Sequence, residues 1–86
     1  MPKIIPTAKP DKNDEVDFVW LGKYVRHKRT SLGMGLIEAA DMCGLSKTAY
    51  SNVELGRKSR VETFFIVLKN FGIRLSVEEH DDDQWI

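Results

Sequence analysis

The sequence has few cysteines and no long apolar segment. Its single cysteine, Cys43, excludes an internal disulfide and is typical of a protein from a reducing compartment. No apolar run approaches the roughly 20 residues that a membrane-spanning helix needs, and the N-terminus lacks the apolar segment of a signal peptide. These absences predict a cytoplasmic protein with no membrane partner.

Residue sets that support catalysis are also missing. We find no Ser/His/Asp set, no glycine-rich phosphate loop and no pair of carboxylates suited to a cleft. A chain of 86 residues forms one domain, with little room for a buried cleft and its supporting shell. His80 precedes three aspartates, but such a run on a tail is usually solvated. The sequence therefore predicts no enzyme activity, no metal and no cofactor.

The net charge of zero conceals an uneven distribution along the chain. Residues 21–60 contain eight lysines and arginines and three acidic residues, a net charge of +5. Residues 61–86 contain two basic and six acidic residues, a net charge of −4. A basic middle and an acidic end indicate a polyanionic partner for the first and a different task for the second.

Hydrophobic periodicity and helix-ending residues predict four helices after a flexible arm over residues 1–15, which holds all three prolines. The helices are expected over residues 16–31, 36–43, 47–55 and 61–71. Apolar residues near helical spacing should bury one side of the first helix: Val16, Val19, Trp20 and Tyr24, with Leu21 and Val25 beside them. The same rule gives the buried face of the fourth helix as Val61, Phe64, Phe65, Leu68 and Phe71.

The second and third helices make a candidate helix-turn-helix within a domain over residues 16–72. Gly44 allows a sharp turn, Ser46 is a good N-cap, and apolar residues such as Tyr50 anchor the third helix from within. Polar and basic side chains remain on its free face and in the loop that follows. Those expected to contact base edges and phosphates of DNA are Ser46, Lys47, Thr48, Ser51, Asn52, Arg57 and Lys58.

The pattern changes from helical to alternating after Gly72. Ile73, Leu75 and Val77 alternate with polar residues, which predicts a half-buried strand over residues 73–78. A lone strand cannot satisfy its own backbone groups, so its expected partner is the same strand of a second copy, with these three as dimerisation residues. Residues 79–86 form an acidic tail whose tip, Trp85-Ile86, is expected to bind a partner.

A set of short motifs resembles the Cro/cI-type (XRE) helix-turn-helix family over residues 20–72. The motifs are Leu21-Gly22-Lys23, Arg29, Ala40, Gly44-Leu45-Ser46, Glu54 with Gly56, and Glu62-Thr63-Phe64. A Phe64-Phe65 helix followed by a strand is closest in layout to the HipB-like antitoxins. The resemblance implies a mostly α, lambda-repressor-like domain of four helices, with a C-terminal strand paired across a homodimer. It also implies an ion pair between Arg29 and Glu54.

The same resemblance implies a repressor that binds a double-stranded DNA operator, autoregulates a toxin–antitoxin operon and has a HipA-like kinase toxin as partner. Such a dimer inserts its third helices at two half-sites about one helical turn apart. Two alternatives stay open. One is a stand-alone phage or metabolic regulator without a toxin. The other is a toxin-neutralising module that binds DNA weakly, which is favoured by Gly35-Leu36 where the family usually has Thr/Ser-Gln.

Overall fold

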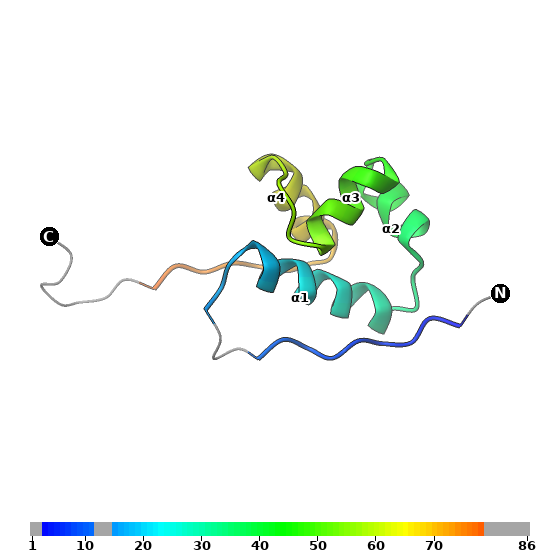
Figure 1. Cartoon of the computed structure of the whole chain (residues 1–86), viewed down its shortest axis with the longest axis horizontal. Coiled ribbons are helices and arrows are strands. Elements are labelled where there is room, and N and C mark those ends of the chain that lie inside the picture. Colours follow the sequence, from blue (N-terminus) through cyan, green and yellow to red (C-terminus); the bar gives the residue numbers. More distant parts are fainter. Residues whose placement is uncertain (1–2, 12–14, 79–86) are drawn as a thin grey trace, which may run out of the picture.

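The computed structural model describes residues 3–11 and 15–78. Within them the chain forms four helices, which together make a mostly α-helical domain (Figure 1). The helices are α1 (Phe18–Ser31), α2 (Leu36–Cys43), α3 (Lys47–Glu54) and α4 (Val61–Asn70). The four predicted helices are confirmed, with ends within two residues of the predicted ones.

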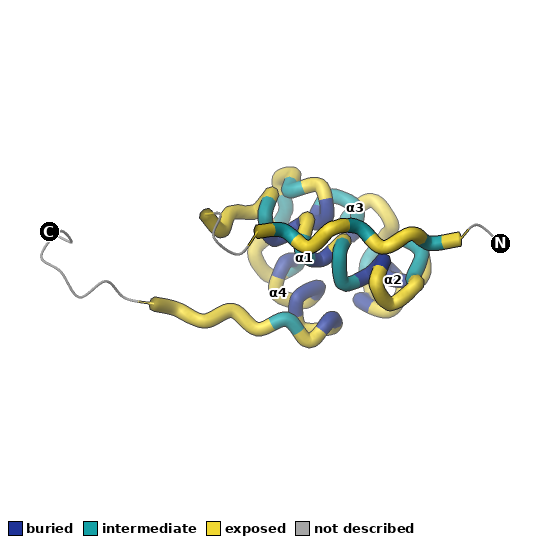
Figure 2. Tube along the Cα trace, turned by 90° about the horizontal axis from the view of Figure 1, so that it is seen from below, coloured by how far each residue is buried: buried dark blue, intermediate teal, exposed yellow. Residues whose placement is uncertain are grey.

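The core lies where one side of each helix meets the others, and the remaining surface is exposed (Figure 2). Its buried apolar residues come from all four helices and from the end of α4: Leu21, Val25, Ala39, Ala40, Cys43, Tyr50, Val53, Phe64, Val67, Leu68 and Phe71. Cys43 is buried among them, where it packs as a small apolar residue.

Two of the predicted buried faces are partly wrong. On α4, Val61 and Phe65 are more than half exposed, whereas Val67 is fully buried. Phe64, Val67, Leu68 and Phe71 follow the i, i+3, i+4, i+7 spacing of one narrow face, and Phe65 lies to the side of it. In the predicted first helix, likewise, the core takes up Leu21 and Val25, while Val19 on α1 and Val16 just before it remain about half exposed.

A glycine allows α1 to pack closely on α3. A Cβ at Gly22 would overlap the carbonyl oxygens of Glu54 and Val53, so no larger residue fits without moving a backbone. At its start, α1 is capped by Asp17, whose Oδ1 accepts a hydrogen bond from the Trp20 amide (2.8 Å). The cap sets where α1 begins, and Gly22 sets how near it lies to α3.

Residues 3–11 run alongside α1, on the side away from α3 (Figures 1 and 2). The Thr7 amide donates to Thr30 Oγ1 (2.9 Å), and the Thr7 carbonyl lies 2.8 Å from His27 Nδ1. Further along, Trp20 Nε1 donates to the Asp11 carbonyl (2.9 Å). The flexibility expected of residues 1–15 stays a prediction, but the described part of this arm has specific contacts with the helix.

The segment after α4 contains no strand within residues 73–78. It leaves the domain as an extended trace (Figure 1). A strand exists only when its backbone pairs with a second strand, and a single copy of this chain supplies none within the described residues. The predicted strand and its pairing across a dimer are thus not confirmed by one chain, and residues 79–86 lie outside the described part.

Candidate nucleic-acid interface

A tight turn joins α2 to α3. Gly44 ends α2 with a φ of 68°, a left-handed conformation in which glycine is favoured. The Leu45 amide donates to the Ala40 carbonyl (2.9 Å), and Ser46 Oγ accepts from the Ala49 amide (3.1 Å). These bonds satisfy backbone groups that the two helix ends would otherwise leave open. The turn and the cap together fix the direction of α3.

The two sides of α3 differ in exposure. Tyr50 and Val53 are fully buried in the core, and Leu45 packs against the same cluster. The predicted contact residues lie elsewhere on the surface of the helix and at its N-cap. Three of them are exposed, namely Ser46, Lys47 and Thr48, and two are half-buried, namely Ser51 and Asn52. The helix therefore presents hydrogen-bonding side chains outward, while its inner side holds it in the domain.

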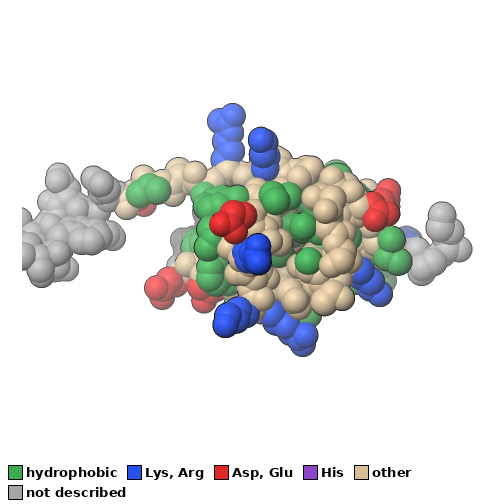
Figure 3. All heavy atoms as spheres, turned by 90° about the horizontal axis from the view of Figure 1, so that it is seen from above, with side chains coloured by type: hydrophobic (Ala, Val, Ile, Leu, Met, Phe, Trp, Pro, Cys, Tyr) green, Lys and Arg blue, Asp and Glu red, His purple; other side chains and the backbone are tan. Residues whose placement is uncertain are grey.

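The loop after α3 holds the other two predicted contact residues, Arg57 and Lys58, both exposed. The Arg57 amide donates to the Asn52 carbonyl (2.9 Å), which closes the loop against the end of the helix. Gly56 has a φ of 68°, in the left-handed region. A Cβ atom added to it would lie 2.7 Å from Val19 Cα, so the loop rests directly on α1. On the face that Figure 3 shows, Lys and Arg side chains are scattered rather than gathered in one patch.

A buried ion pair connects α3 to α1. Arg29 Nε donates to Glu54 Oε2 (2.6 Å) and Nη2 donates to Oε1 (3.1 Å), with both side chains less than a tenth exposed. Arg29 Nη1 also donates to the carbonyl of Met34, in the turn before α2 (2.8 Å). The guanidinium thus links α1, the turn before α2 and the end of α3. Burial lowers the pKa of Arg29, but the hydrogen bond and charge of Glu54 outweigh it and raise the pKa overall.

The hydroxyl of Tyr50 is buried beside this ion pair and has no hydrogen-bond partner within the described residues. Burial, and then the nearby Glu54 carboxylate, raise the pKa of Tyr50 far above its ordinary value. The phenol therefore stays neutral throughout the physiological range. Its ring packs against Phe71, with centroids 6.4 Å apart, so Tyr50 serves mainly as an apolar anchor of α3.

Sequence reasoning missed two features of this framework. The third acceptor for the Arg29 guanidinium is the backbone carbonyl of Met34. Every residue has a backbone carbonyl, so the amino-acid sequence gives no sign of this contact. The arm contacts to α1 were missed as well, although His27 and Thr30 are polar residues one turn apart on a helix that also carries the core. Polar residues on the outer side of a helix are usually solvated, so the pattern alone did not indicate a packed segment.

Other predicted sites lie at the end of the chain. Ile73 is half-buried against the core, Leu75 is 49% exposed and Val77 is 90% exposed. Trp85 and Ile86 are outside the described residues. Within residues 3–11 and 15–78, no group of three His, Cys, Asp or Glu side chains could hold a metal ion. None of the helices there combines the length and apolarity that crossing a bilayer requires.

Comparisons with known proteins agree with this architecture. A sequence profile of the family described as "Helix-turn-helix" matches residues 25–77. Among solved structures, a complex of a HipB variant with an O2 20mer has 18% identity and a TM-score of 0.68, and the match covers 80% of this chain and 97% of that chain. HipB in a HipA-HipB-O2-O3 complex has 19% identity and a TM-score of 0.67, covering 78% and 96%. HipB in complex with an O4 20mer gives the same values. No curated protein sequence matches the chain.

Proposed function

Because the chain belongs to the helix-turn-helix family, we propose that it is a sequence-specific DNA-binding transcription regulator that reads its operator with α3. One observation carries the proposal: the polar outer side of α3 is exposed while the buried Arg29–Glu54 pair fixes the helix to α1. Base-edge contacts need side chains on a rigid element, and this pair supplies the rigidity. The similar HipB structures in complex with 20mers support the same use of the fold.

In the proposed mechanism α3 enters the major groove. Lys47, exposed in the first turn of the helix, suits guanine, whose O6 and N7 are both acceptors. Asn52 is half-buried and five residues further on, where it suits adenine or a phosphate. Ser46 and Thr48 fix the position of the helix, and Arg57 in the following loop meets the phosphate backbone. Affinity then depends mainly on phosphates and falls as salt rises.

We further propose that the regulator is a homodimer joined through residues 73–78. Leu75 and Val77 leave apolar surface exposed, and the exposed Phe65 on α4 lines the same groove as Leu75. A second copy that covers this surface would also pair the backbone of the segment. Two-fold symmetry then places two α3 helices at half-sites about one helical turn apart.

A toxin is the proposed protein partner. One similar structure is described as a complex of HipA with HipB and O2-O3, which supports a HipA-like kinase as the partner and autoregulation of a shared operon. In this chain the proposed contact is the acidic tail, with Trp85 and Ile86 as its apolar anchor. A tryptophan carried on an acidic segment fits a contact that forms on a partner surface.

Leu36 favours one second candidate, a toxin-neutralising module with weak DNA affinity. It begins α2 after Gly35, and neither residue has a side chain that can donate a hydrogen bond to a phosphate, so the usual family contact is missing there. A mobility shift on the chain's own promoter, repeated at several salt concentrations, separates the two. A DNA-binding regulator should bind tightly at low salt and lose affinity steeply as the salt concentration rises. The toxin-neutralising module should bind the promoter weakly at every salt concentration.

The reading face is tested with Lys47→Ala and Thr48→Ala. Each should weaken binding to the selected operator by roughly 5- to 150-fold, because a base contact contributes about 1–3 kcal/mol. Both side chains are exposed, so the melting temperature should not change. Lys23→Ala, an exposed lysine on α1, is the matched control and should bind normally. Wild-type affinity in both test variants would remove α3 from the interface.

The toxin contact is tested by deleting residues 80–86. Isothermal titration against the protein encoded beside this gene should show a clear loss of affinity, while operator binding stays within a few-fold of wild type. Unchanged affinity for that protein would remove the tail from the contact. Absence of any toxin gene beside this one, with operator binding intact, would favour the stand-alone regulator.

A further inference from the structure

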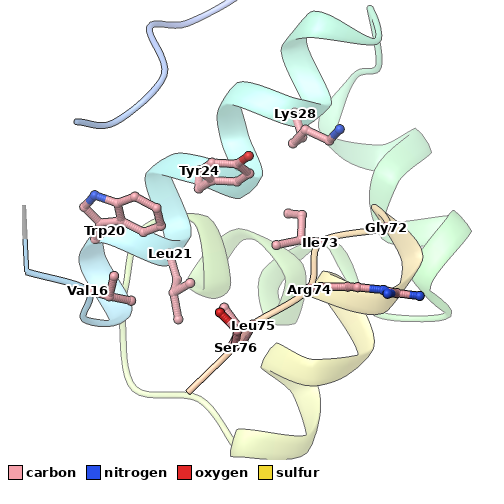
Figure 4. Close-up of a pocket in the computed structure, with 10 residues that line it drawn as sticks. All are labelled: Val16, Trp20, Leu21, Tyr24, Lys28, Gly72, Ile73, Arg74, Leu75 and Ser76. Carbon is pink, nitrogen blue, oxygen red and sulfur yellow. The ribbon is translucent and has the colours of Figure 1, made fainter. Parts of the chain in front are cut away.

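A groove of about 390 Å³ runs between α1 and the segment that follows α4. Trp20, Leu21 and Tyr24 form its helical wall, and Ile73 and Leu75 form the other (Figure 4). A second groove flanks the same segment on its α4 side, beside Phe65 and Leu68. The segment therefore lies between two apolar depressions.

The backbone of this segment is unpaired beyond its first residue. The Ile73 amide donates to the Leu68 carbonyl (2.9 Å), which completes the end of α4. From Arg74 to Glu78 the backbone makes no hydrogen bond with any other described residue. An extended, unpaired backbone beside apolar grooves is a template for one more strand. The proposed dimer supplies that strand, and the following inference rests on it.

The alternation of side chains limits how two copies can pair. In an antiparallel pair, directly opposite residues point to the same face of the sheet. The apolar residues of this segment all have odd numbers, so an apolar residue faces another apolar one only in registers where the numbers of the two opposite residues add up to an even number. Two such registers use most of the segment. In one, Leu75 lies opposite Leu75 of the second copy. In the other, Ser76 lies opposite Ser76.

We propose that the dimer adopts the Ser76 register. It places Arg74 of each copy opposite Glu78 of the other, which makes two ion pairs on the polar face. On the apolar face it places Leu75 opposite Val77 twice, and these are the two apolar side chains of the segment that the single chain leaves most exposed. The segment is then self-complementary in charge and in hydrophobicity, as a two-fold interface requires.

The Leu75 register satisfies these groups less well. Arg74 would face Ser76, and Glu78 would face Gly72, so both charges would lack an opposite partner. Val77 would face Ile73, which already packs against the core of its own chain. Registers shifted further in either direction pair fewer residues of the segment.

Single cysteines distinguish the two registers in the full-length protein. Directly opposite Cα atoms in an antiparallel pair are about 4.5–5.5 Å apart, which a disulfide can bridge. Under mild oxidation, Ser76→Cys should cross-link into a covalent dimer several-fold faster than Leu75→Cys. The wild type, whose Cys43 is buried, is the control and should not cross-link. Faster cross-linking of Leu75→Cys, or none by either variant, overturns the register.

A charge exchange tests the ion pairs independently. Arg74→Glu and Glu78→Arg each turn two attractive pairs into two repulsive ones and should raise the dimer dissociation constant roughly tenfold. The double variant should return it to within about three-fold of wild type. If the double variant loses as much dimer affinity as the two single variants added together, the register is overturned. Sedimentation of the same samples separates the two proposals, because a stable dimer without this coupling refutes only the register, whereas a wild-type monomer refutes the dimer.

Discussion

Replacing Glu54 with alanine should bring the domain close to unfolding. The substitution removes both hydrogen bonds of the Arg29 guanidinium to the carboxylate and leaves that cation buried with only the Met34 carbonyl as acceptor. Removing one partner of a buried ion pair typically costs about 3–5 kcal/mol. At about 0.05–0.15 kcal/mol per residue, a chain of 86 residues has about 4–13 kcal/mol of stability in total. The loss is thus a large part of the whole.

Urea denaturation followed by circular dichroism measures the effect. The urea concentration at the midpoint of unfolding should fall sharply, while the dependence of the unfolding free energy on urea concentration should stay similar to that of wild type. The matched control is the double variant Arg29→Met, Glu54→Leu, which leaves no buried charge and should lose less stability than Glu54→Ala alone. A loss below about 1 kcal/mol in Glu54→Ala would mean that the pair contributes no more than an exposed one, and that the close packing of α1 on α3 fixes the helix instead.

Three further outcomes follow from the packing. Leu75→Pro removes a backbone donor and an apolar contact, so it should sediment as a monomer; a dimer would place the interface elsewhere. Gly22→Val should lower the melting temperature by about 10 °C, because its side chain would meet α3 backbone, and a normal melt would show that α1 can shift. Burial raises the pKa of Tyr50 above its ordinary value, so the folded state holds that proton and wild-type stability falls as pH rises above about 10. Tyr50→Phe should lose less stability over that range, and an equal loss would contradict this.

The helices were predictable from sequence because their signals are local. Caps, positive-φ glycines and the 3.6-residue period each act within a few residues, so the bounds of α2 needed no tertiary information. The buried faces were harder to predict. Val61 and Phe65 are apolar and close to the right spacing, but they lie outside the narrow face that packs on the core and remain exposed.

The predicted contact residues on α3 could be placed on its outer side because Tyr50 and Val53 mark the inner side. What could not be read from the pattern depends on contacts between distant segments. The Met34 carbonyl and the arm along α1 are of this kind. The strand predicted over residues 73–78 is a different case, because a strand forms only against a second one and the described part of a single chain supplies none.

The arm gives α1 a distinct place in the dynamics of the domain. The helix is covered by α3 on one side, and on the other Thr7 and Asp11 accept or donate hydrogen bonds along its length (Figure 2). These contacts on two sides should make the backbone hydrogen bonds of α1 open less readily than those of a helix that is held on one side only. In an amide hydrogen-exchange experiment, α1 should therefore be among the last segments to exchange. Removing residues 3–11 should speed exchange across α1 while leaving α2 unchanged.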